Sequence, residues 1–291
     1  MNQSATLAVV GGDIRQAYLA GLLCEDGHTV RTFALERHPI EGCAAVSDLR
    51  SCFTDVQAVI LPLPVQHGNA QLNAPLSNIP YPLFDVLDAI PACTVTLAGS
   101  VPFGVHARAV QNNLRLIDYL ARDELAIRNA VPTCEGALQL AMEQTAHTIQ
   151  HSRCLVIGYG RIGALLAQKL HALDAQVTVS ARSPRDFARI ETQGMQVLDT
   201  RQLSGHLAKF DIIFNTVPAP VLGAAELAGL AHSCLIIDLA SMPGGISPEA
   251  KLPSECRILH ALSLPGKVAP LTAAHAIHDT ICNILHEEGI L

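Results

Sequence analysis

Three glycines in the middle of the chain have the spacing of a pyrophosphate-binding turn. Gly158, Gly160 and Gly163 follow an apolar run and precede a helical pattern. In such a G-x-G-x-x-G pattern the first glycine permits a tight turn and the second lets the backbone approach the phosphates. The third lets the helix pack closely on the strand, and the N–H groups at the helix start face the phosphates. Because a second apolar strand follows the helix, we expect a dinucleotide site here rather than a plain glycine-rich turn.

The end of that second strand indicates which dinucleotide is bound. An NAD site usually places Asp or Glu about 20 residues after the glycines, where it bonds the ribose 2′-hydroxyl. Here the strand ends Ser180-Ala181-Arg182-Ser183, without an acid. Arg182 can pair with a 2′-phosphate and Ser183 can donate to it, so we expect NADP(H). The alternative is that Arg182 is only a solvated loop cation.

Further apolar runs in this half predict a parallel sheet that is buried on both faces. They lie at 154–157, 177–181, 210–215, 234–239 and 257–261. Two of them end in short loops, 215–218 and 240–245, and ligands of such sheets bind at the carboxyl ends of the strands. The predicted cofactor-binding residues are Gly158, Gly160, Arg161, Ile162, Gly163, Arg182, Ser183, Asn215, Thr216, Val217, Pro218, Ala240 and Ser241.

The first half of the chain repeats the same strand–turn–helix–strand unit. When Gly11 is placed on Gly158, apolar positions of the two following helices also coincide. Asp13 then stands at the second glycine position and Gln16 at the third. An acid that faces the pyrophosphate is unfavourable, so we expect no dinucleotide in this half. Strands are predicted at 58–61, 94–97 and 114–117, and a long loop at 66–82.

These patterns predict an α/β protein of two doubly wound, Rossmann-like domains with a cleft between them. We expect residues 1–128 to form a substrate domain, joined by a C-terminal helix at 272–291. Residues 129–271 would form the NADP-binding domain. A helix at 133–149, with Thr133 as its N-cap, would lie between the domains.

Composition excludes several classes of protein. The 291 residues carry a net charge of −7 without a run of Lys or Arg, which argues against nucleic acid. No apolar run is long enough to span a bilayer, and the N-terminus does not read as a signal peptide. The nine cysteines lack a CxxC spacing and are typical of buried free thiols in a reducing cytoplasm. We expect no metal site, because His275 and His278 share a helix face without an evident third ligand.

Seven short segments, in this order, resemble the family of the dipicolinate synthase A subunit. They are Gly11–Gln16, Pro132–Ala137, the glycine pattern, Ala181-Arg182, Ile213–Ala219, Ile237–Gly245 and Leu264–Pro270. The resemblance runs over nearly the whole chain. It implies an enzyme that makes pyridine-2,6-dicarboxylate from a dihydrodipicolinate-type substrate by hydride transfer to NADP. It also implies a partner, the flavoprotein-like B subunit of dipicolinate synthase, and we expect a homo-oligomer.

Two positions depart from the family pattern. Met242 and Leu271 stand where family members often carry lysine, whereas Lys267 lies between Gly266 and Val268. The two-domain plan also resembles the D-2-hydroxyacid dehydrogenases. A hydroxyacid or imino-acid dehydrogenase and a non-catalytic nucleotide sensor therefore remain as alternatives.

The implied reaction requires groups that hold two carboxylates and accept a proton. Arg15 and Lys267 can bind carboxylates, and the alternative for Arg15 is a structural salt bridge. Glu135 is the predicted acid or base, against a helix-stabilising acid near an N-terminus. Thr133 is either a cap or a hydroxyl donor to the substrate, and His260 is more readily explained as a bystander. The backbone at Gly244-Gly245 is either an anion nest or a plain turn.

Overall fold

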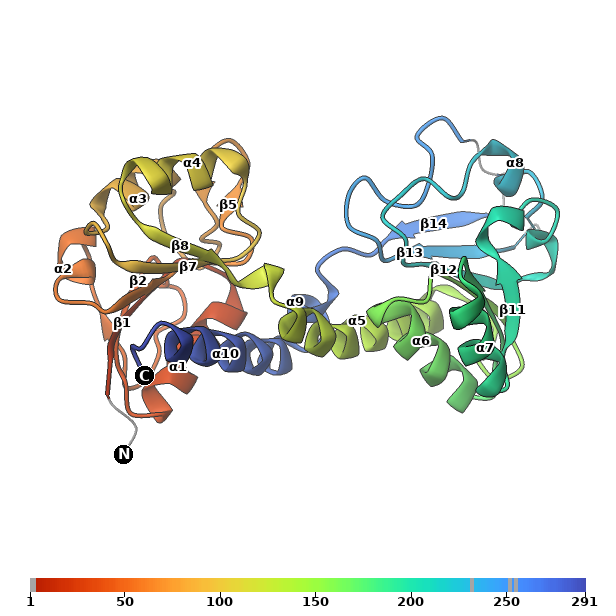
Figure 1. Cartoon of the computed structure of the whole chain (residues 1–291), viewed down its shortest axis with the longest axis horizontal. Helices are drawn as coiled ribbons and strands as arrows, with labels where there is room; N and C mark the ends of the chain where they lie inside the picture. The colour runs from red at the N-terminus through yellow and green to blue at the C-terminus, as the bar shows by residue number, and fades with distance from the viewer. Residues whose placement is uncertain (1–3, 231–232, 251–252, 254–255) are drawn as a thin grey trace. The chain divides into compact units, whose positions relative to one another are not determined.

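Two compact units make up the chain, and the structure, a computed structural model, describes residues 4–230, 233–250, 253 and 256–291. Unit 1 contains residues 1–129 and 269–291, and unit 2 contains residues 130–268 (Figure 1). Each unit is built around one six-stranded parallel sheet. The chain therefore leaves unit 1, forms unit 2, and returns to unit 1 with its last helix.

The sheet of unit 1 has the strand order β3-β2-β1-β4-β7-β8. Its strands are β1 (Thr6–Val10), β2 (Thr29–Phe33), β3 (Ala44–Ala45), β4 (Ala58–Ile60), β7 (Val95–Ala98) and β8 (Arg115–Asp118). Its helices are α1 (Ile14–Glu25), α2 (Leu49–Phe53), α3 (Leu83–Ala89), α4 (Phe103–Gln111) and α10 (Pro270–Glu287), with a 3₁₀ turn at Tyr119–Ala121.

The strands of unit 1 bury side chains on both faces. Leu7 and Val9 of β1 pack in a cluster with α1 and α10, whereas Ala8 and Val10 pack in another with α2, α3 and α4. Figure 1 shows α1 and α10 side by side under the sheet. The near-continuous apolar runs of the sequence follow from this burial on two faces.

The sheet of unit 2 has the strand order β11-β10-β9-β12-β13-β14. Its strands are β9 (Arg153–Ile157), β10 (Gln176–Ala181), β11 (Gln196–Asp199), β12 (Ile212–Asn215), β13 (Leu235–Asp238) and β14 (Arg257–His260). Its helices are α6 (Arg161–Ala172), α7 (Pro184–Thr192), α8 (Ala224–Leu227) and α9 (Leu264–Val268), with 3₁₀ turns at Thr200–Gln202 and Leu207–Lys209. α5 (Asp123–Gln144) begins in unit 1 and continues into unit 2.

The two sheets have the same topology, which is that of a dinucleotide-binding fold. In each unit the first strand in sequence lies at the centre, two strands follow on one side, and three more on the other. The predicted fold class, two doubly wound α/β units, is confirmed.

Three local predictions differ from the structure. The predicted loop at 66–82 contains a small antiparallel hairpin of β5 (Gln66–His67) and β6 (Gln71–Leu72). The segment around Lys267, where the Pro265-Gly266 pair is typical of a turn, is the short helix α9. The nine cysteines are all free, but Cys24, Cys43 and Cys282 are only partly buried and Cys93 is exposed.

The helix predicted at 133–149 is displaced and longer than expected. α5 begins at Asp123, ends at Gln144 and carries Pro132 in its interior, so the prediction of Thr133 as an N-cap is wrong. Proline removes one helical hydrogen bond and usually ends a helix. Here the turn after Pro132 buries Cys134, Ala137 and Ala141 in the core of unit 2, and this packing keeps the helix continuous.

Among the described residues, no helix is long and apolar enough to cross a membrane, as expected from the sequence.

Candidate functional site

The turn between β9 and α6 has the backbone geometry that a pyrophosphate site requires. Gly158 adopts φ +96°, a conformation that L-residues with a side chain rarely adopt. A β-carbon at this position would lie 2.6 Å from Thr216 Oγ1 and 2.9 Å from a methyl group of Val217. Only glycine therefore fits between β9 and the loop that follows β12.

The other two glycines of the pattern have different surroundings. A β-carbon at Gly163 would overlap the carbonyl oxygen of Gly158, so this glycine allows α6 to pack directly on the turn. Gly160 is the N-cap of α6, and a β-carbon there would meet nothing within 4 Å. The start of a twelve-residue helix thus faces open space at the carboxyl end of β9, where its N–H groups and dipole favour an anion.

The segment from the end of β10 into α7 carries two arginines, Arg182 and Arg185, and one acid, Asp186. Arg182 is exposed directly after the strand. Ser183 is the N-cap of α7, and its hydroxyl accepts from the Asp186 N–H at 3.1 Å and donates to the Asp186 carboxylate at 2.7 Å. The Ser183 hydroxyl is therefore engaged within the protein, and Asp186 supplies a negative charge that the strand itself lacks. The predicted preference for a 2′-phosphate therefore depends on Arg182 and not on Ser183.

The loop after β12 is fixed by hydrogen bonds to β9 and to itself. The Thr216 N–H and hydroxyl both donate to the Ile157 carbonyl at 2.9 Å. The Asn215 side chain accepts from the Val217 N–H at 3.2 Å and donates to the Val217 carbonyl at 3.0 Å. Asn215 is fully buried, so its amide shapes this loop, while Pro218 is exposed beyond it.

A buried carboxylate at the end of β13 holds the next loop in place. Asp238 is 1% exposed. Its Oδ1 accepts from the Asn215 amide at 2.8 Å and from the Ala240 N–H at 3.2 Å, and its Oδ2 accepts from the Gly245 N–H at 2.9 Å. Asp238 was not among the predicted site residues, although an acid at the end of the apolar run Leu235–Asp238 is a signal in the sequence that could have indicated it.

The backbone at Gly244-Gly245 forms a turn rather than an anion nest. The Gly244 N–H donates to the Ser241 carbonyl at 2.9 Å and the Gly245 N–H to Asp238. Both donors are therefore satisfied inside the loop. A β-carbon at Gly245 would overlap the Asn215 amide, which explains why this loop needs glycine.

The candidate catalytic residues of α5 lie on opposite sides of the helix. Thr133 is buried, whereas the Glu135 side chain is 54% exposed and pairs with Lys169 of α6 at 3.2 Å. Between them, burial raises the pKa of the Cys134 thiol to about 12, so this thiol stays protonated at neutral pH. The structure thus shows Glu135 as an exposed, ion-paired acid on the helix surface.

Lys267 and His260 are both exposed in unit 2. Lys267 lies in α9, which packs closely against α5: a β-carbon at Gly136 would lie 3.1 Å from Leu264 Cβ. His260 ends β14, and its Nδ1 lies 3.7 Å from Asp238 Oδ2. Met242, which replaces an expected lysine, is exposed at 76%.

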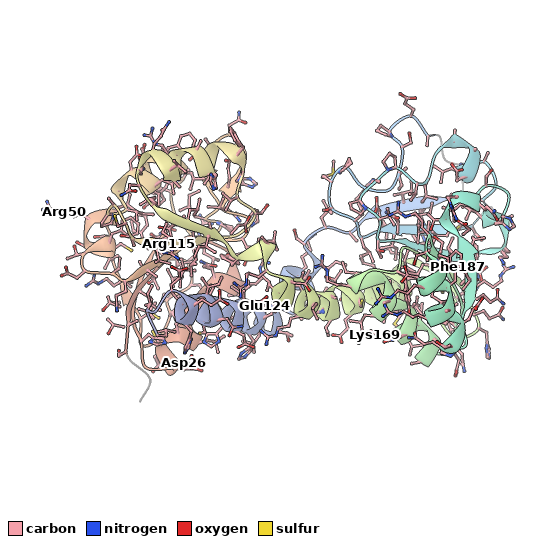
Figure 2. The ribbon with its side chains drawn as sticks, in the orientation of Figure 1. Asp26, Arg50, Arg115, Glu124, Lys169 and Phe187 are labelled. Atoms are coloured by element: carbon pink, nitrogen blue, oxygen red, sulfur yellow. The ribbon has the colours of Figure 1, made fainter. Side chains whose placement is uncertain are left out.

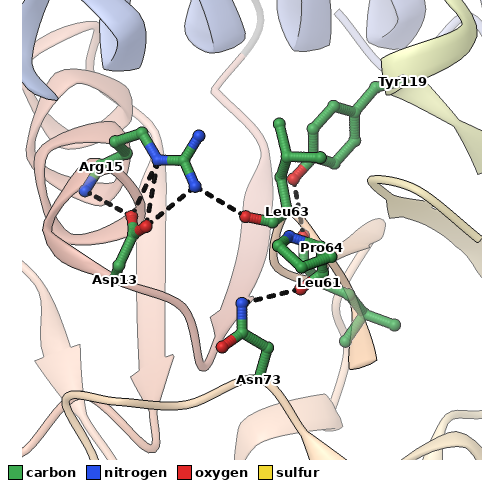
Figure 3. Close-up of polar contacts among 7 residues, drawn as sticks. All are labelled: Asp13, Arg15, Leu61, Leu63, Pro64, Asn73 and Tyr119. Carbon is green, nitrogen blue, oxygen red and sulfur yellow. Dashed lines mark hydrogen bonds and ion pairs between the residues drawn. The ribbon is translucent and has the colours of Figure 1, made fainter. Parts of the chain in front are cut away.

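In unit 1 the turn after β1 is filled by the protein's own charges. Asp13 is the N-cap of α1 and accepts from the Arg15 N–H at 3.0 Å. The same carboxylate binds Arg15 Nε at 3.0 Å and Nη2 at 2.8 Å, and the Arg15 side chain is only 9% exposed (Figure 3). Gln16, at the third glycine position, is buried and packs against Gly12.

Arg15 also holds the loop that follows β4. Its Nη2 donates to the Leu63 carbonyl at 2.7 Å (Figure 3). Tyr119 donates to the Leu61 carbonyl at 3.1 Å, and Asn73 to the Pro64 carbonyl at 2.9 Å. Of the two readings of Arg15, the structural salt bridge is the one that these contacts support.

Two family models match separate parts of the chain. The model for the N-terminal domain of the dipicolinate synthase A subunit matches residues 6–120. The model "Shikimate / quinate 5-dehydrogenase" matches residues 139–260, which include the glycine turn and the loops after β12 and β13.

Relatives match over the full length of both units. The A subunit of dipicolinate synthase from Bacillus subtilis (strain 168) is 33% identical over 284 residues, covering 97% of this chain and 96% of that protein. The crystal structure of the A chain of dipicolinate synthase from Bacillus subtilis has a TM-score of 0.89 at 32% identity, covering 99% and 97% of the two chains. The crystal structure of the same synthase component from Bacillus halodurans has a TM-score of 0.91 at 28% identity, covering 98% and 99%.

More distant structures show the fold alone. Transhydrogenase from Sinorhizobium meliloti has a TM-score of 0.72 at 16% identity, covering 98% of this chain and 94% of that one. The two-unit architecture of this chain is therefore also found in a transhydrogenase.

Proposed function

The chain belongs to the family of the dipicolinate synthase A subunit, and from this premise we propose that it oxidises a dihydrodipicolinate-type substrate to pyridine-2,6-dicarboxylate with NADP⁺ as hydride acceptor. Family and fold are those of dehydrogenase-type oxidoreductases, which use a nicotinamide cofactor. The electron acceptor, the substrate and the residues that bind them are our proposals.

The observation that carries the proposal is the contrast between the two helix starts. In unit 2 the N-terminus of α6 follows Gly160 and faces open space. In unit 1 the N-terminus of α1 is capped by Asp13, which is itself paired with Arg15. An incoming pyrophosphate meets free space and a positive helix end in unit 2, but a carboxylate in unit 1. We therefore assign one cofactor to each chain, bound in unit 2.

Oxidation of the dihydropyridine ring removes two hydrogens. One of them would leave a ring carbon as hydride, for which a bound nicotinamide would supply the acceptor. The other leaves as a proton, and the ring becomes aromatic. The protein must then bind two carboxylates, hold the ring in place and receive one proton at a polar group or through a water molecule.

The groups available for these tasks in unit 2 are Lys267, Thr133 and Glu135. Lys267 is an exposed cation on α9 and suits one substrate carboxylate. Glu135 is the proton acceptor in this proposal, and its carboxylate pairs with Lys169 at 3.2 Å. Arg15 contributes by holding the loop after β4 rather than by direct contact with the substrate.

The proposed preference for NADP⁺ depends on Arg182. Its guanidinium is exposed at the end of β10, where the adenine ribose of a Rossmann cofactor binds. Asp186 opposes this preference through its charge, but its carboxylate is occupied by the Ser183 hydroxyl. The name of the related protein, one lettered component of a synthase, implies a partner, and we propose that the partner is a flavoprotein-like B subunit.

A turnover assay tests the proposed function. The full chain is mixed with freshly made dihydrodipicolinate and NADP⁺, and both NADPH and pyridine-2,6-dicarboxylate are quantified, with and without the B subunit. One NADPH should form for each dicarboxylate. Conversion of 2-hydroxy acids or imino acids in its place would support the dehydrogenase alternative. Absence of turnover under all conditions, with NADPH binding retained, would support a nucleotide sensor.

A further inference from the structure

Three side chains with metal-binding atoms converge in unit 1, where α1 ends beside α10. Asp26 is the C-cap of α1, and His278 and Cys282 lie one turn apart on α10. His278 Nε2 is 2.8 Å from Asp26 Oδ2 and 3.6 Å from Cys282 Sγ. All three ligand atoms lie within 4.8 Å of one another. We propose that Asp26, His278 and Cys282 bind a divalent zinc-type ion, with water in the fourth position.

The identity and separation of the atoms suit zinc. Imidazole nitrogen, thiolate sulfur and carboxylate oxygen are the three ligand types that zinc takes in proteins. Tetrahedral bond lengths place such atoms roughly 3.3–3.8 Å apart. The nitrogen–sulfur distance is already in this range. The nitrogen–oxygen distance only has to open slightly, because a hydrogen bond now occupies the space of the ion.

A further carboxylate orients the histidine. Asp279 Oδ1 lies 3.3 Å from His278 Nδ1, the ring nitrogen that faces away from the proposed ion. Metal-binding histidines commonly donate this N–H to a carboxylate, which fixes the tautomer and strengthens the ligand. Asp279 is held in turn by Arg128, whose Nη1 lies 3.2 Å from its Oδ2. The cluster therefore has an outer layer as well as three ligands.

The place of the cluster indicates a structural ion. Asp26 comes just before β2, at the amino end of the unit 1 strands, whereas ligands of such sheets bind at the carboxyl ends. The Asp26 side chain, labelled in Figure 2, is 44% exposed and that of His278 14%, so an ion can reach the cluster from solvent. A bound ion would tie the returning helix α10 to α1, in addition to the packing between them.

The remaining histidines of this region lie around the cluster without completing it. His286 Nδ1 donates to the Cys282 carbonyl at 2.7 Å, and the Ala5 N–H donates to His28 Nδ1 at 3.3 Å. A water molecule is therefore the expected fourth ligand.

Cobalt binding to the full-length, untagged chain tests the proposal. After treatment with a chelator, the protein is titrated with Co²⁺, which reports tetrahedral geometry in the visible range and thiolate ligation as a near-ultraviolet charge-transfer band. We expect one equivalent to bind with this band, and Zn²⁺ to displace it. The band should disappear in Cys282→Ala, and Asp279→Ala should weaken binding by about 10–100-fold.

Matched variants separate this cluster from other metal-binding groups. His275→Ala removes an exposed histidine from the same helix, and Cys43→Ala breaks the Cys24–Cys43 pair, whose sulfurs lie 2.7 Å apart. Both should bind cobalt like the parent chain. If the band survives in Cys282→Ala, or is lost in Cys43→Ala alone, the site is assigned wrongly. Failure of the parent chain to bind one equivalent would also overturn it. Cys282→Ser, which keeps the size of the side chain, replaces Cys282→Ala if that variant does not fold.

Discussion

In the proposed function, Arg182 carries the choice between the two nicotinamide cofactors. The neighbouring hydroxyl of Ser183 is hydrogen-bonded to Asp186, so the proposal assigns recognition of the 2′-phosphate to the Arg182 guanidinium. Arg182→Ala should weaken NADPH binding about tenfold or more, the effect of losing one charge-assisted hydrogen bond, and leave NADH binding nearly unchanged. Titration of the protein with each cofactor measures this difference.

The helix that follows Arg182, α7, offers a control variant. Arg189 is also exposed, in the last turn of α7, and Arg189→Ala changes the net charge equally. It should leave both affinities unchanged. Equal affinity of the unmodified protein for NADPH and NADH would contradict the proposed preference.

Asp238 should be the polar residue whose loss most disturbs the loops beside the cofactor site. Its two oxygens accept from three N–H donors in a fully buried position. Asp238→Asn keeps the shape, but its NH₂ group must face one of these donors in either orientation. We expect a loss of about 1–3 kcal/mol in the free energy of unfolding, measured by urea denaturation. Asp174→Asn, at an exposed turn, should be nearly neutral. A similar effect in both variants would show that the buried network contributes little.

At the scale of elements, the junction of β9 and α6 depends on the absence of a side chain at Gly163. Gly163→Ala places a β-carbon against the Gly158 carbonyl, and this overpacking should cost about 1–3 kcal/mol. Gly104, in the first turn of α4, has no atom within 4 Å of the corresponding position. Gly104→Ala should therefore stabilise the protein by up to about 1 kcal/mol. Thermal unfolding of the two variants measures both effects, and a stable Gly163→Ala variant would refute the close packing.

The sequence predicted the strands better than the helix that joins the units. Apolar runs such as 210–215 and 234–239 mark buried strands, and the strands begin or end within two residues of these bounds. The helix around Thr133 was predicted too late because Pro132 is a strong local signal for a helix boundary. That signal is outweighed by the burial of Cys134 and Ala137, which no local pattern reveals. Asp123 and Glu124, two acids in the first turn, were the available sign of the true start.

The sequence predicted the parts of the candidate site that depend on backbone conformation. It did not predict the hydrogen bonds and ion pairs between side chains. The roles of Gly158 and Gly163 follow from spacing alone, and the structure shows the close contacts that require glycine. The partner of Glu135 is Lys169 on another helix, which could not be read from the sequence. Asp13 and Asp186 lie only two and three residues from Arg15 and Ser183, so local patterns allowed these pairs, although they were not predicted.

At the scale of the whole molecule, the chain contains two copies of one strand–turn–helix unit. In the copy in unit 1, a side chain of the protein occupies the place where the proposed site in unit 2 would bind phosphate. Both units have the same strand order and a helix that starts after a glycine turn. In unit 1 the N-cap of that helix is Asp13, and in unit 2 it is Gly160. The two helix starts thus differ at one equivalent position. In unit 1 the carboxylate of the N-cap residue occupies the helix N-terminus, whereas in unit 2 the N-terminus is free to bind the anion of a ligand.

Calorimetric titration of the full chain with NADPH tests this account most directly, using Gly160→Asp to copy the Asp13 cap into unit 2. Aspartate is a favourable N-cap and the position has free space, so the variant should fold normally. We predict one NADPH bound per chain in the parent protein and in Asp13→Ala, and no detectable binding in Gly160→Asp. Retained binding in a folded Gly160→Asp variant, together with loss of binding in Asp13→Ala, would place the cofactor in unit 1 and contradict the account.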